Sequence, residues 1–307
     1  DIPHCTTDYR DVLSDSTVDC VIIATPPQFH AEQAVAAIKA GKHVLIEKPL
    51  ALTIADVQLI ANTARDYPDR IVLSAAARHS RMQPKFGFIK NIIDEGRIGS
   101  VYHIHHQVLR RGKRYGIEYN PEATWSLSRV KAGGGPFFDW GVYDLSFHLG
   151  LFQDQLKLEH VLSATYNGTD DARKSFPDFD VEEHGVALMR FSSGISYYYE
   201  RSTNSHLERP NQTIIHGSEG ALSFDYLSWG DPVVSITEGT GDRTKVSRVE
   251  EVTIPIPDDF DDHMAIIEHL IDCVVEGETP LLTPFQELSH YEIIHRMIEA
   301  PPRYLRD

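Results

Sequence analysis

Two short stretches, far apart in the chain, carry residue types that can exchange protons and hold charge. One is Glu47-Lys48-Pro49, where a carboxylate and an ammonium follow an apolar run. The other follows Gly133-Gly134-Gly135 and contains Asp139 and Tyr143. A helix that begins near Phe138 would put Asp139 and Tyr143, four residues apart, on one face, where a carboxylate and a phenol can form a proton relay. Taken alone, each stretch is also typical of a turn without catalytic chemistry.

The first stretch lies in a strand-helix-strand unit. Val18 to Ala24 is a nearly continuous apolar run that stops at Thr25-Pro26-Pro27, which predicts a buried, central parallel strand. His30 to Ala40 follows as a helix, and His43 to Ile46 as a second strand. Because such a crossover joins parallel strands, Thr25-Pro26-Pro27 and Glu47-Lys48-Pro49 should lie at the same edge of the sheet. Open α/β sheets bind ligands along that edge.

The remaining pattern predicts an α/β unit followed by a sheet-rich unit. We expect residues 1–79 to form a partial Rossmann-type parallel sheet domain, with Arg78 at the carboxyl end of a strand from Ile71 to Ala77. Residues 80–307 should form an α+β domain with a large, mostly antiparallel open sheet. Its predicted strands are 100–109, 158–167, 181–191, 195–201, 212–216, 233–237 and 246–254, and the predicted helices beyond residue 50 are 53–65, 84–95, 263–275 and 284–300.

Composition excludes several classes of function. The chain has 307 residues and a formal charge of −16, without a Lys/Arg-rich run, so we expect neither a nucleic-acid nor a membrane partner. Only Cys5, Cys20 and Cys273 occur, which favours a cytoplasmic protein without a disulfide framework. His103 and His105 share one face of a strand, but their spacing suggests no third ligand, so no metal site is predicted.

The apolar strand ending in Ala-Thr-Pro, His30, the Ala-rich helix, Ala-Gly-Lys-His-Val and Glu-Lys-Pro-Leu-Ala together resemble one family. It is the glucose-fructose oxidoreductase, inositol dehydrogenase and rhizopine catabolism (Gfo/Idh/MocA) family. The resemblance implies an oxidoreductase that uses NAD or NADP and transfers hydride to or from a sugar-like or cyclic alcohol or carbonyl compound. It also implies a homo-oligomer formed through the C-terminal sheet.

The resemblance further implies roles for single residues. Tyr143 stands where many relatives have a histidine, as in the tyrosine-containing branch of the family, and the implied catalytic residues are Lys48, Asp139 and Tyr143. A phenol has a reference pKa of about 10, and an adjacent Lys48 ammonium should lower it. The Lys48-Pro49 bond is a candidate cis peptide. The implied cofactor-binding residues are Ala24, Thr25, Pro26, Pro27, His30, Glu47, Lys48, Pro49, Arg78 and Trp125.

One departure from the family pattern keeps other functions open. The G-x-G-x-x-G turn that binds dinucleotide phosphates does not occur, because Gly133-Gly134-Gly135 precedes a proline and Gly239-Thr240-Gly241 opens no predicted helix. We therefore expect a chain that begins within the cofactor domain and lacks this N-terminal segment. The alternatives are an NAD-dependent glycosidase of the same family, and a cofactor-free binding or assembly protein or fragment.

Overall fold

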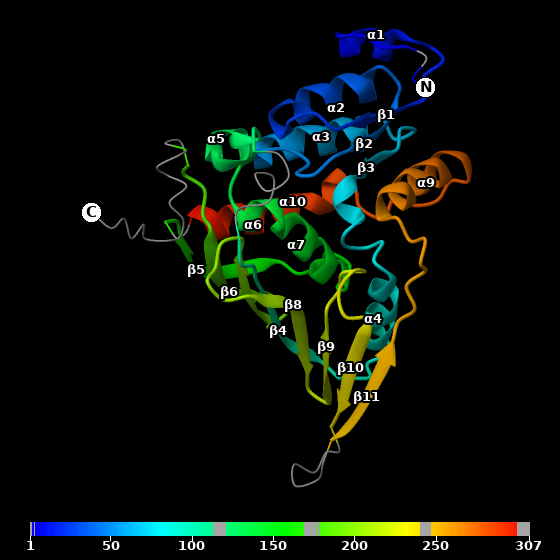
Figure 1. The fold of residues 1–307 in the computed structure, drawn as a ribbon. Coiled ribbons are helices and arrows are strands. Elements are labelled where there is room, and N and C mark those ends of the chain that lie inside the picture. The colour runs from blue at the N-terminus through cyan, green and yellow to red at the C-terminus, as the bar shows by residue number, and fades with distance from the viewer. Residues whose placement is uncertain are drawn as a thin grey trace.

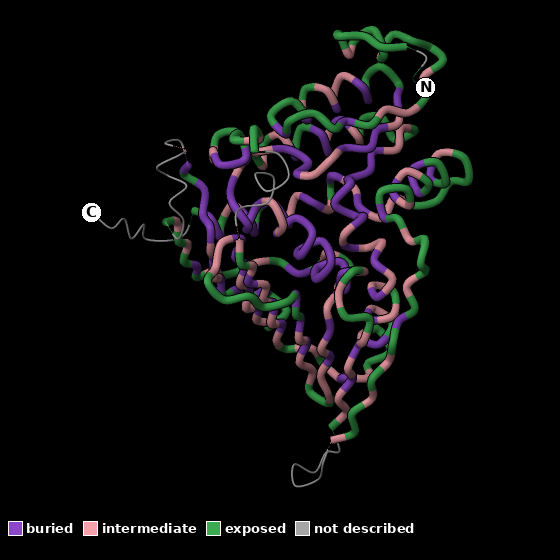
Figure 2. The backbone as a smooth tube through the Cα atoms, in the orientation of Figure 1, coloured by how far each residue is buried: buried purple, intermediate pink, exposed green. Residues whose placement is uncertain are grey.

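A computed structural model describes residues 2, 4–112, 121–168, 176, 179–239 and 247–299. Two sheets make up the fold, a small parallel sheet near the N-terminus and a large sheet farther along the chain (Figure 1). Helices lie between the two sheets, and the buried backbone is concentrated there (Figure 2). The prediction of a Rossmann-type parallel sheet followed by a large, mostly antiparallel sheet is confirmed.

The small sheet has three parallel strands in the order β1-β2-β3. Ile23 pairs with Ile46 and Ile46 with Ser74, so the strands end side by side at one edge. The prediction that the first apolar run is central is wrong within the described residues, because β2 occupies the middle and Ile22 of β1 is 51% exposed. The strands are β1 (Cys20–Ile23), β2 (His43–Ile46) and β3 (Val72–Ser74).

The helices of this part begin and end where the sequence provides signals. The crossover helix α2 buries Ala34, Ala37 and Ile38, and Gly41 follows it with a φ of 80°. Thr53 caps the start of helix α3, and its side chain accepts a hydrogen bond from the backbone N–H of Asp56. The elements are α1 (Tyr9–Ser14), η1 (Pro27–Phe29), α2 (His30–Lys39), α3 (Ile54–Asp66) and η2 (Ala75–Ala77).

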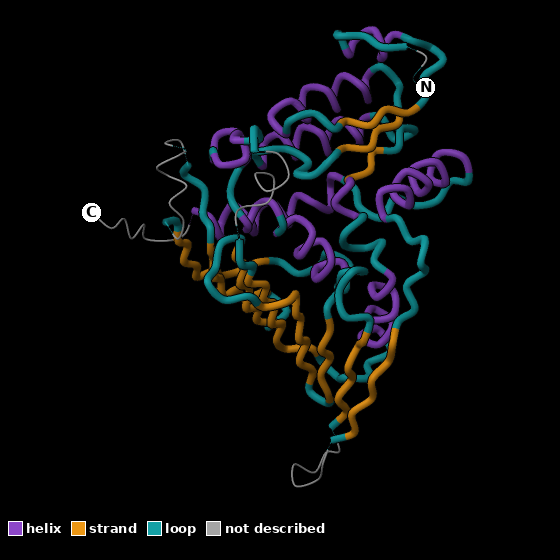
Figure 3. The backbone as a smooth tube through the Cα atoms, viewed as in Figure 1, coloured by secondary structure: helices purple, strands orange, loops and turns teal. Residues whose placement is uncertain are grey.

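The large sheet has eight strands in the order β11-β10-β9-β8-β4-β7-β6-β5. Figure 3 shows its strands in orange, in the half of the molecule away from the N-terminus. All neighbouring pairs are antiparallel except β4 and β7, which run parallel. The strands are β4 (Val101–Leu109), β5 (Leu158–Tyr166), β6 (His184–Phe191), β7 (Ser196–Ser202), β8 (Arg209–Gly217), β9 (Gly220–Phe224), β10 (Val233–Glu238) and β11 (Arg248–Thr253). Of these, β9 is absent from the sequence prediction. It follows β8 closely, and only Ser218 and Glu219 separate the two strands.

Helices on the inner face of the large sheet form the centre of the molecule. Every residue of α7 is buried, and α10 packs against both α7 and α3, which ties the end of the chain to the N-terminal part. All the helices described beyond residue 80, on this face or elsewhere, are α4 (Pro84–Asp94), η3 (Thr124–Leu127), α5 (Arg129–Ala132), α6 (Pro136–Asp139), α7 (Gly141–Gly150), α9 (Asp262–Val275) and α10 (Pro284–Glu299). None of the helices in the described part of the chain combines the length and apolar character needed to cross a membrane.

Two further predicted elements differ from the structure. The strand predicted for residues 71–77 ends at Ser74, and Ala75–Ala77 turns as a 3-10 helix before Arg78. The helix predicted from Phe138 onward is broken at Trp140 into α6 and α7. Alanine and apolar side chains are compatible with either conformation, so tertiary packing decides both cases.

Candidate active site

Two turns leave the carboxyl edge of the small sheet, and a buried histidine joins them. His30 is fully buried; its Nε2 lies 2.7 Å from the carbonyl oxygen of Thr25, and its Nδ1 lies 2.9 Å from that of Pro49. The ring therefore fixes the turn after β1 relative to the turn after β2. This contact is structural, and His30 does not reach the cavity described below.

Lys48 extends from the second turn toward the segment between α6 and α7. The Lys48-Pro49 peptide bond is cis. Lys48 Nζ lies 2.7 Å from Asp139 Oδ1 and 3.3 Å from the Asp139 carbonyl oxygen, and each side chain keeps 20% of its surface exposed. Burial lowers the pKa of Lys48, but the Asp139 carboxylate, through its charge and its hydrogen bond, and the other acidic groups nearby outweigh burial and raise it overall, so the ammonium stays protonated.

The glycine-rich stretch brings Asp139 and Tyr143 to this ammonium. Gly133 has a φ of 84°, and a side chain at Gly135 would collide with the Glu182 carbonyl oxygen. The backbone N–H of Gly135 donates to Glu182 Oε1 at 2.8 Å. The close approach that these glycines allow is therefore made to the protein's own backbone. This contact with Glu182 holds the start of α6 in place, and α7 follows α6 directly after Trp140.

The phenol of Tyr143 is held by an arginine. Arg78 Nη2 donates to the Tyr143 hydroxyl oxygen at 3.0 Å, and Arg78 also forms an ion pair with Glu47. Lys48 Nζ lies 5.2 Å from the centre of the Tyr143 ring. The prediction that a neighbouring cation gives a lowered phenol pKa is wrong. Burial raises the pKa of Tyr143 to about 12, although Lys48 and Arg78 oppose it.

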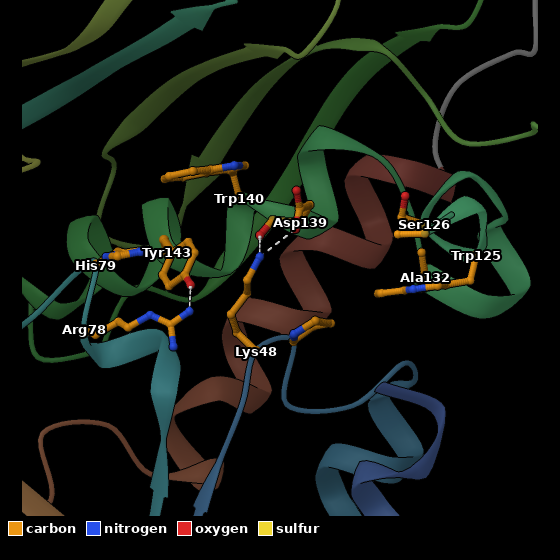
Figure 4. Close-up of a pocket in the computed structure, with 11 residues that line it drawn as sticks. Lys48, Arg78, His79, Trp125, Ser126, Ala132, Asp139, Trp140 and Tyr143 are labelled. Carbon is orange, nitrogen blue, oxygen red and sulfur yellow. Dashed lines mark hydrogen bonds and ion pairs between the residues drawn. The ribbon is translucent and has the colours of Figure 1, made fainter. Parts of the chain in front are cut away.

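These groups surround one cavity of about 270 Å³. Figure 4 shows Lys48 and Arg78 reaching it from the N-terminal part of the chain, while Asp139 and Tyr143 reach it from α6 and α7. Trp125 lies at the other end, on the segment that precedes the glycines. The lining consists of Lys48, Pro49, Arg78, His79, Ala123, Trp125, Ser126, Ala132, Asp139, Trp140 and Tyr143.

The structure thus brings together six of the predicted site residues and leaves six outside the lining. Lys48, Pro49, Arg78, Trp125, Asp139 and Tyr143 line the cavity, whereas Ala24, Thr25, Pro26, Pro27, His30 and Glu47 do not. Sequence reasoning missed His79 and Trp140. Each is adjacent to a predicted site residue, but the stacking of the two rings on each other joins positions far apart in sequence.

A buried ionic network supports the wall of the cavity. Asp144, next to Tyr143, accepts hydrogen bonds from Arg201 Nε at 2.6 Å and Nη2 at 2.8 Å. It also accepts from the hydroxyls of Tyr199 and Tyr226. The Arg201 guanidinium lies 4.8 Å from the centre of the Trp140 ring, so the network contacts the back of an indole that lines the cavity.

A parallel sheet with a polar cavity at its carboxyl edge, joined to a large open sheet, defines a Rossmann-type two-sheet protein. Residues 1–74 match the oxidoreductase family with an NAD-binding Rossmann fold, and residues 86–223 match the GFO/IDH/MocA C-terminal domain. The chain belongs to the Gfo/Idh/MocA oxidoreductase family, as its sequence motifs predict.

Similar proteins with curated functions include three sugar or cyclitol enzymes. Levoglucosan dehydrogenase of Pseudarthrobacter phenanthrenivorans is 27% identical over 254 residues, 78% of this chain. 1,5-Anhydro-D-fructose reductase of Ensifer adhaerens is 29% identical over 235 residues, 75% of the chain. Myo-inositol 2-dehydrogenase of Thermotoga maritima is 27% identical over 237 residues, 77% of the chain. In each case the match spans 64% of the length of the relative.

Solved structures share the fold. An oxidoreductase domain protein from Kribbella flavida superposes with a TM-score of 0.79 at 22% identity, covering 96% of this chain and 81% of that one. Levoglucosan dehydrogenase in complex with NADH and levoglucosan gives a TM-score of 0.78 at 22% identity and the same coverage.

Proposed function

We propose that this chain is an NAD(P)-dependent oxidoreductase that interconverts a hydroxyl and a carbonyl group on a sugar-like or cyclic polyol. The observation that carries the proposal is the placement of a phenol and an ammonium at one cavity. Arg78 donates to the Tyr143 oxygen, so the phenol's own hydrogen is left to donate elsewhere. Among the described residues it has no further partner, and Tyr143 lines the cavity.

A nicotinamide fits the cavity on chemical grounds. The cavity lies at the carboxyl edge of a parallel sheet, where such ligands bind, and Trp125 and Pro49 offer apolar surface for a ring. Ser126 Oγ is buried and finds no hydrogen-bond partner within the described residues, so a polar group of a ligand would satisfy it.

We propose that residues 1–79 hold the cofactor, with Ala24 to Pro27, His30 and Glu47 shaping its side of the site and Lys48, Pro49, Arg78 and Trp125 lining it. Residues 80–307 would hold the substrate. When bound, NAD or NADP supplies the carbon that accepts or donates hydride.

The protein's own residues would manage the substrate oxygen and its proton. Tyr143 gives its proton to the oxygen of a carbonyl substrate, or takes it from an alcohol, and Lys48 donates a second hydrogen bond to the same oxygen. Asp139 holds the ammonium in place through the 2.7 Å contact. Glu47 and Arg78 hold the phenol in turn.

Two substitutions test this proposal. Tyr143→Phe and Lys48→Met should each lower turnover by about 10²- to 10⁴-fold, the usual contribution of a positioned acid or base. Binding of NADH, followed by nicotinamide fluorescence, should persist. Matched controls are Tyr67→Phe, at an exposed position, and Lys90→Met, which removes a lysine paired with Asp94 away from the cavity; both should turn over normally.

The remaining functions are outcomes of the same experiment. If purified protein binds neither NADH nor NADPH, the chain is a cofactor-free binding or assembly protein or a fragment. If it releases a glycosyl leaving group without net change in added NAD, it is a glycosidase. Wild-type turnover by both site variants would refute the roles given to Tyr143 and Lys48.

The proposal includes a homo-oligomer and a cytoplasmic location. Leu162 and Leu188 are paired across β5 and β6 on the outer face of the large sheet and are 73% and 50% exposed. A second copy would bury this apolar surface. All three cysteines are free, which suits a reducing compartment. Sedimentation of the wild-type protein and of Leu162→Lys tests whether the protein forms a homo-oligomer through this surface.

A further inference from the structure

His79 occupies a position in the cavity that the reaction described above does not use. It follows Arg78 in the segment that leads from η2 into the second part of the chain. Its ring centre lies 4.7 Å from that of Tyr143, and the indole of Trp140 stacks nearly parallel at 6.1 Å. The ring of Trp229 contacts the imidazole edge-on, with the two ring centres 4.9 Å apart. Figure 4 shows the imidazole beside the phenol of Tyr143.

A carboxylate from the distant helix α9 fixes this imidazole. His79 Nδ1 lies 2.7 Å from Asp262 Oδ2, and the Asp262 side chain is only 8% exposed. Gln83 Nε2 donates to the same oxygen at 3.3 Å. Burial raises the pKa of Asp262, but its hydrogen bond with His79 and the neighbouring positive charges, Arg78 among them, together outweigh burial and lower it overall. An ionised carboxylate only accepts hydrogen bonds, so Nδ1 must carry the hydrogen.

The other ring nitrogen therefore has a free lone pair. Burial lowers the pKa of His79, although Asp262 opposes it, so the ring is neutral near pH 7. With the hydrogen on Nδ1, Nε2 is an acceptor. Within the part of the chain that the structure describes, Nε2 makes no hydrogen bond, and it is not among the fully buried polar atoms. Because His79 lines the cavity, this lone pair is available to a ligand.

An acceptor here complements the other polar groups of the cavity. Lys48 and the hydroxyl of Tyr143 act as donors toward a ligand oxygen, whereas Arg78 donates to Tyr143 and pairs with Glu47, and the Asp139 carboxylate accepts from Lys48. A substrate with one hydroxyl needs only those donors. A hydroxyl on a neighbouring carbon would have its own hydrogen to donate, and an adjacent acceptor suits that second group.

We propose that His79 determines specificity by accepting a hydrogen bond from a second substrate hydroxyl at Nε2, and that Asp262 is the residue that positions it. This inference rests on the proposed function for the identity of the cavity. It deepens that function by naming the side chain that recognises a hydroxyl group on the carbon next to the reacting one.

Equilibrium binding tests the inference without turnover. The probes are myo-inositol and D-glucose, added with and without NADH, and the signal is fluorescence of the tryptophans that line the cavity. His79→Phe keeps an aromatic ring between Tyr143 and Trp229 but removes the acceptor. We expect it to weaken binding of at least one probe about tenfold, the effect of one hydrogen bond. His79→Gln, which restores an acceptor, should recover part of the loss.

The role of Asp262 has its own readout. In Asp262→Asn the side-chain amide can donate to Nδ1, which moves the ring hydrogen to Nε2 and turns the acceptor into a donor. Polyol binding should fall although His79 is still present. The matched control is His263→Asn, because His263 contacts the same carboxylate at 3.1 Å but is 65% exposed and does not line the cavity. It should bind both probes like wild type.

Two results would overturn the inference. One is wild-type affinity in His79→Phe, which would make the imidazole a spacer between aromatic rings. The other is a wild-type protein that binds neither polyol. Failure of the proposed function looks different, since it would appear as absent binding of both NADH and NADPH or as undiminished turnover in Tyr143→Phe. Far-ultraviolet circular dichroism of each variant checks that the fold is retained.

Discussion

Replacement of Arg201 by methionine tests the role assigned to the ionic network behind the cavity. The two charged side chains are almost completely buried, with 3% of Arg201 and none of Asp144 exposed. Arg201→Met leaves the Asp144 carboxylate with two phenol donors and a histidine nitrogen 3.4 Å away, but without its cation. Breaking one side of such a buried pair usually costs about 3–5 kcal/mol of unfolding free energy.

The expected loss can be measured by heat or urea. For a chain of this size, each kcal/mol shifts the melting temperature by about 2–4 °C, so Arg201→Met should melt roughly 6–20 °C lower. Urea transitions followed by circular dichroism and tryptophan fluorescence give the same quantity, at one fixed protein concentration because association shifts the apparent stability. Fluorescence of the indole stacked on Arg201 should change as well, since Trp140 loses its support.

Two comparisons decide whether burial is the cause. Arg97→Met removes an arginine that is 31% exposed and pairs with Glu238 and Glu250 on the same sheet. Its loss should leave the transition almost unchanged, because these carboxylates keep their hydration. The double variant Asp144→Asn, Arg201→Met removes both buried charges and should recover much of the lost stability. Equal midpoints for Arg201→Met and Arg97→Met would refute the reasoning.

Two further predictions concern pH. Burial raises the pKa of Glu287 on α10 from 4.5 to about 8. The folded protein then binds more protons than the unfolded chain between these values, so this contribution to stability is complete below about pH 4.5 and is lost as pH rises through 8. Glu287→Gln should flatten that part of the stability profile in urea titrations, and an unchanged slope would contradict the assignment. Because the pKa of Tyr143 is raised to about 12, the phenol is protonated at neutral pH. The kcat/KM for alcohol oxidation should therefore rise steadily from mildly acidic to mildly alkaline pH, whereas that for carbonyl reduction stays flat; a flat oxidation profile would exclude Tyr143 as the proton acceptor.

The sequence alone was sufficient to predict the fold class and the family. Half of the site residues that it predicted line the cavity. Local signals suffice for these, since the apolar runs at β1 and β2 and the Thr53 cap depend on a few neighbouring residues. Glu-Lys-Pro and the glycine-Asp-Tyr stretch marked Lys48, Asp139 and Tyr143, which are brought to one cavity. The same local logic failed at residues 71–77 and at Trp140, where packing ended a strand and broke a helix.

Tertiary structure decided which groups touch and in what electrostatic state. The spacing of Lys48 and Tyr143 along the chain did not show that Arg78 would bond the phenol, or that burial would outweigh two cations in setting its pKa. The partnership of His79 with Asp262 joins residues 183 positions apart, a separation that no local pattern records. Hydrogen bonds and desolvation depend on distances of a few ångströms in the folded state, and those distances are fixed only when the two sheets and the helices between them pack together.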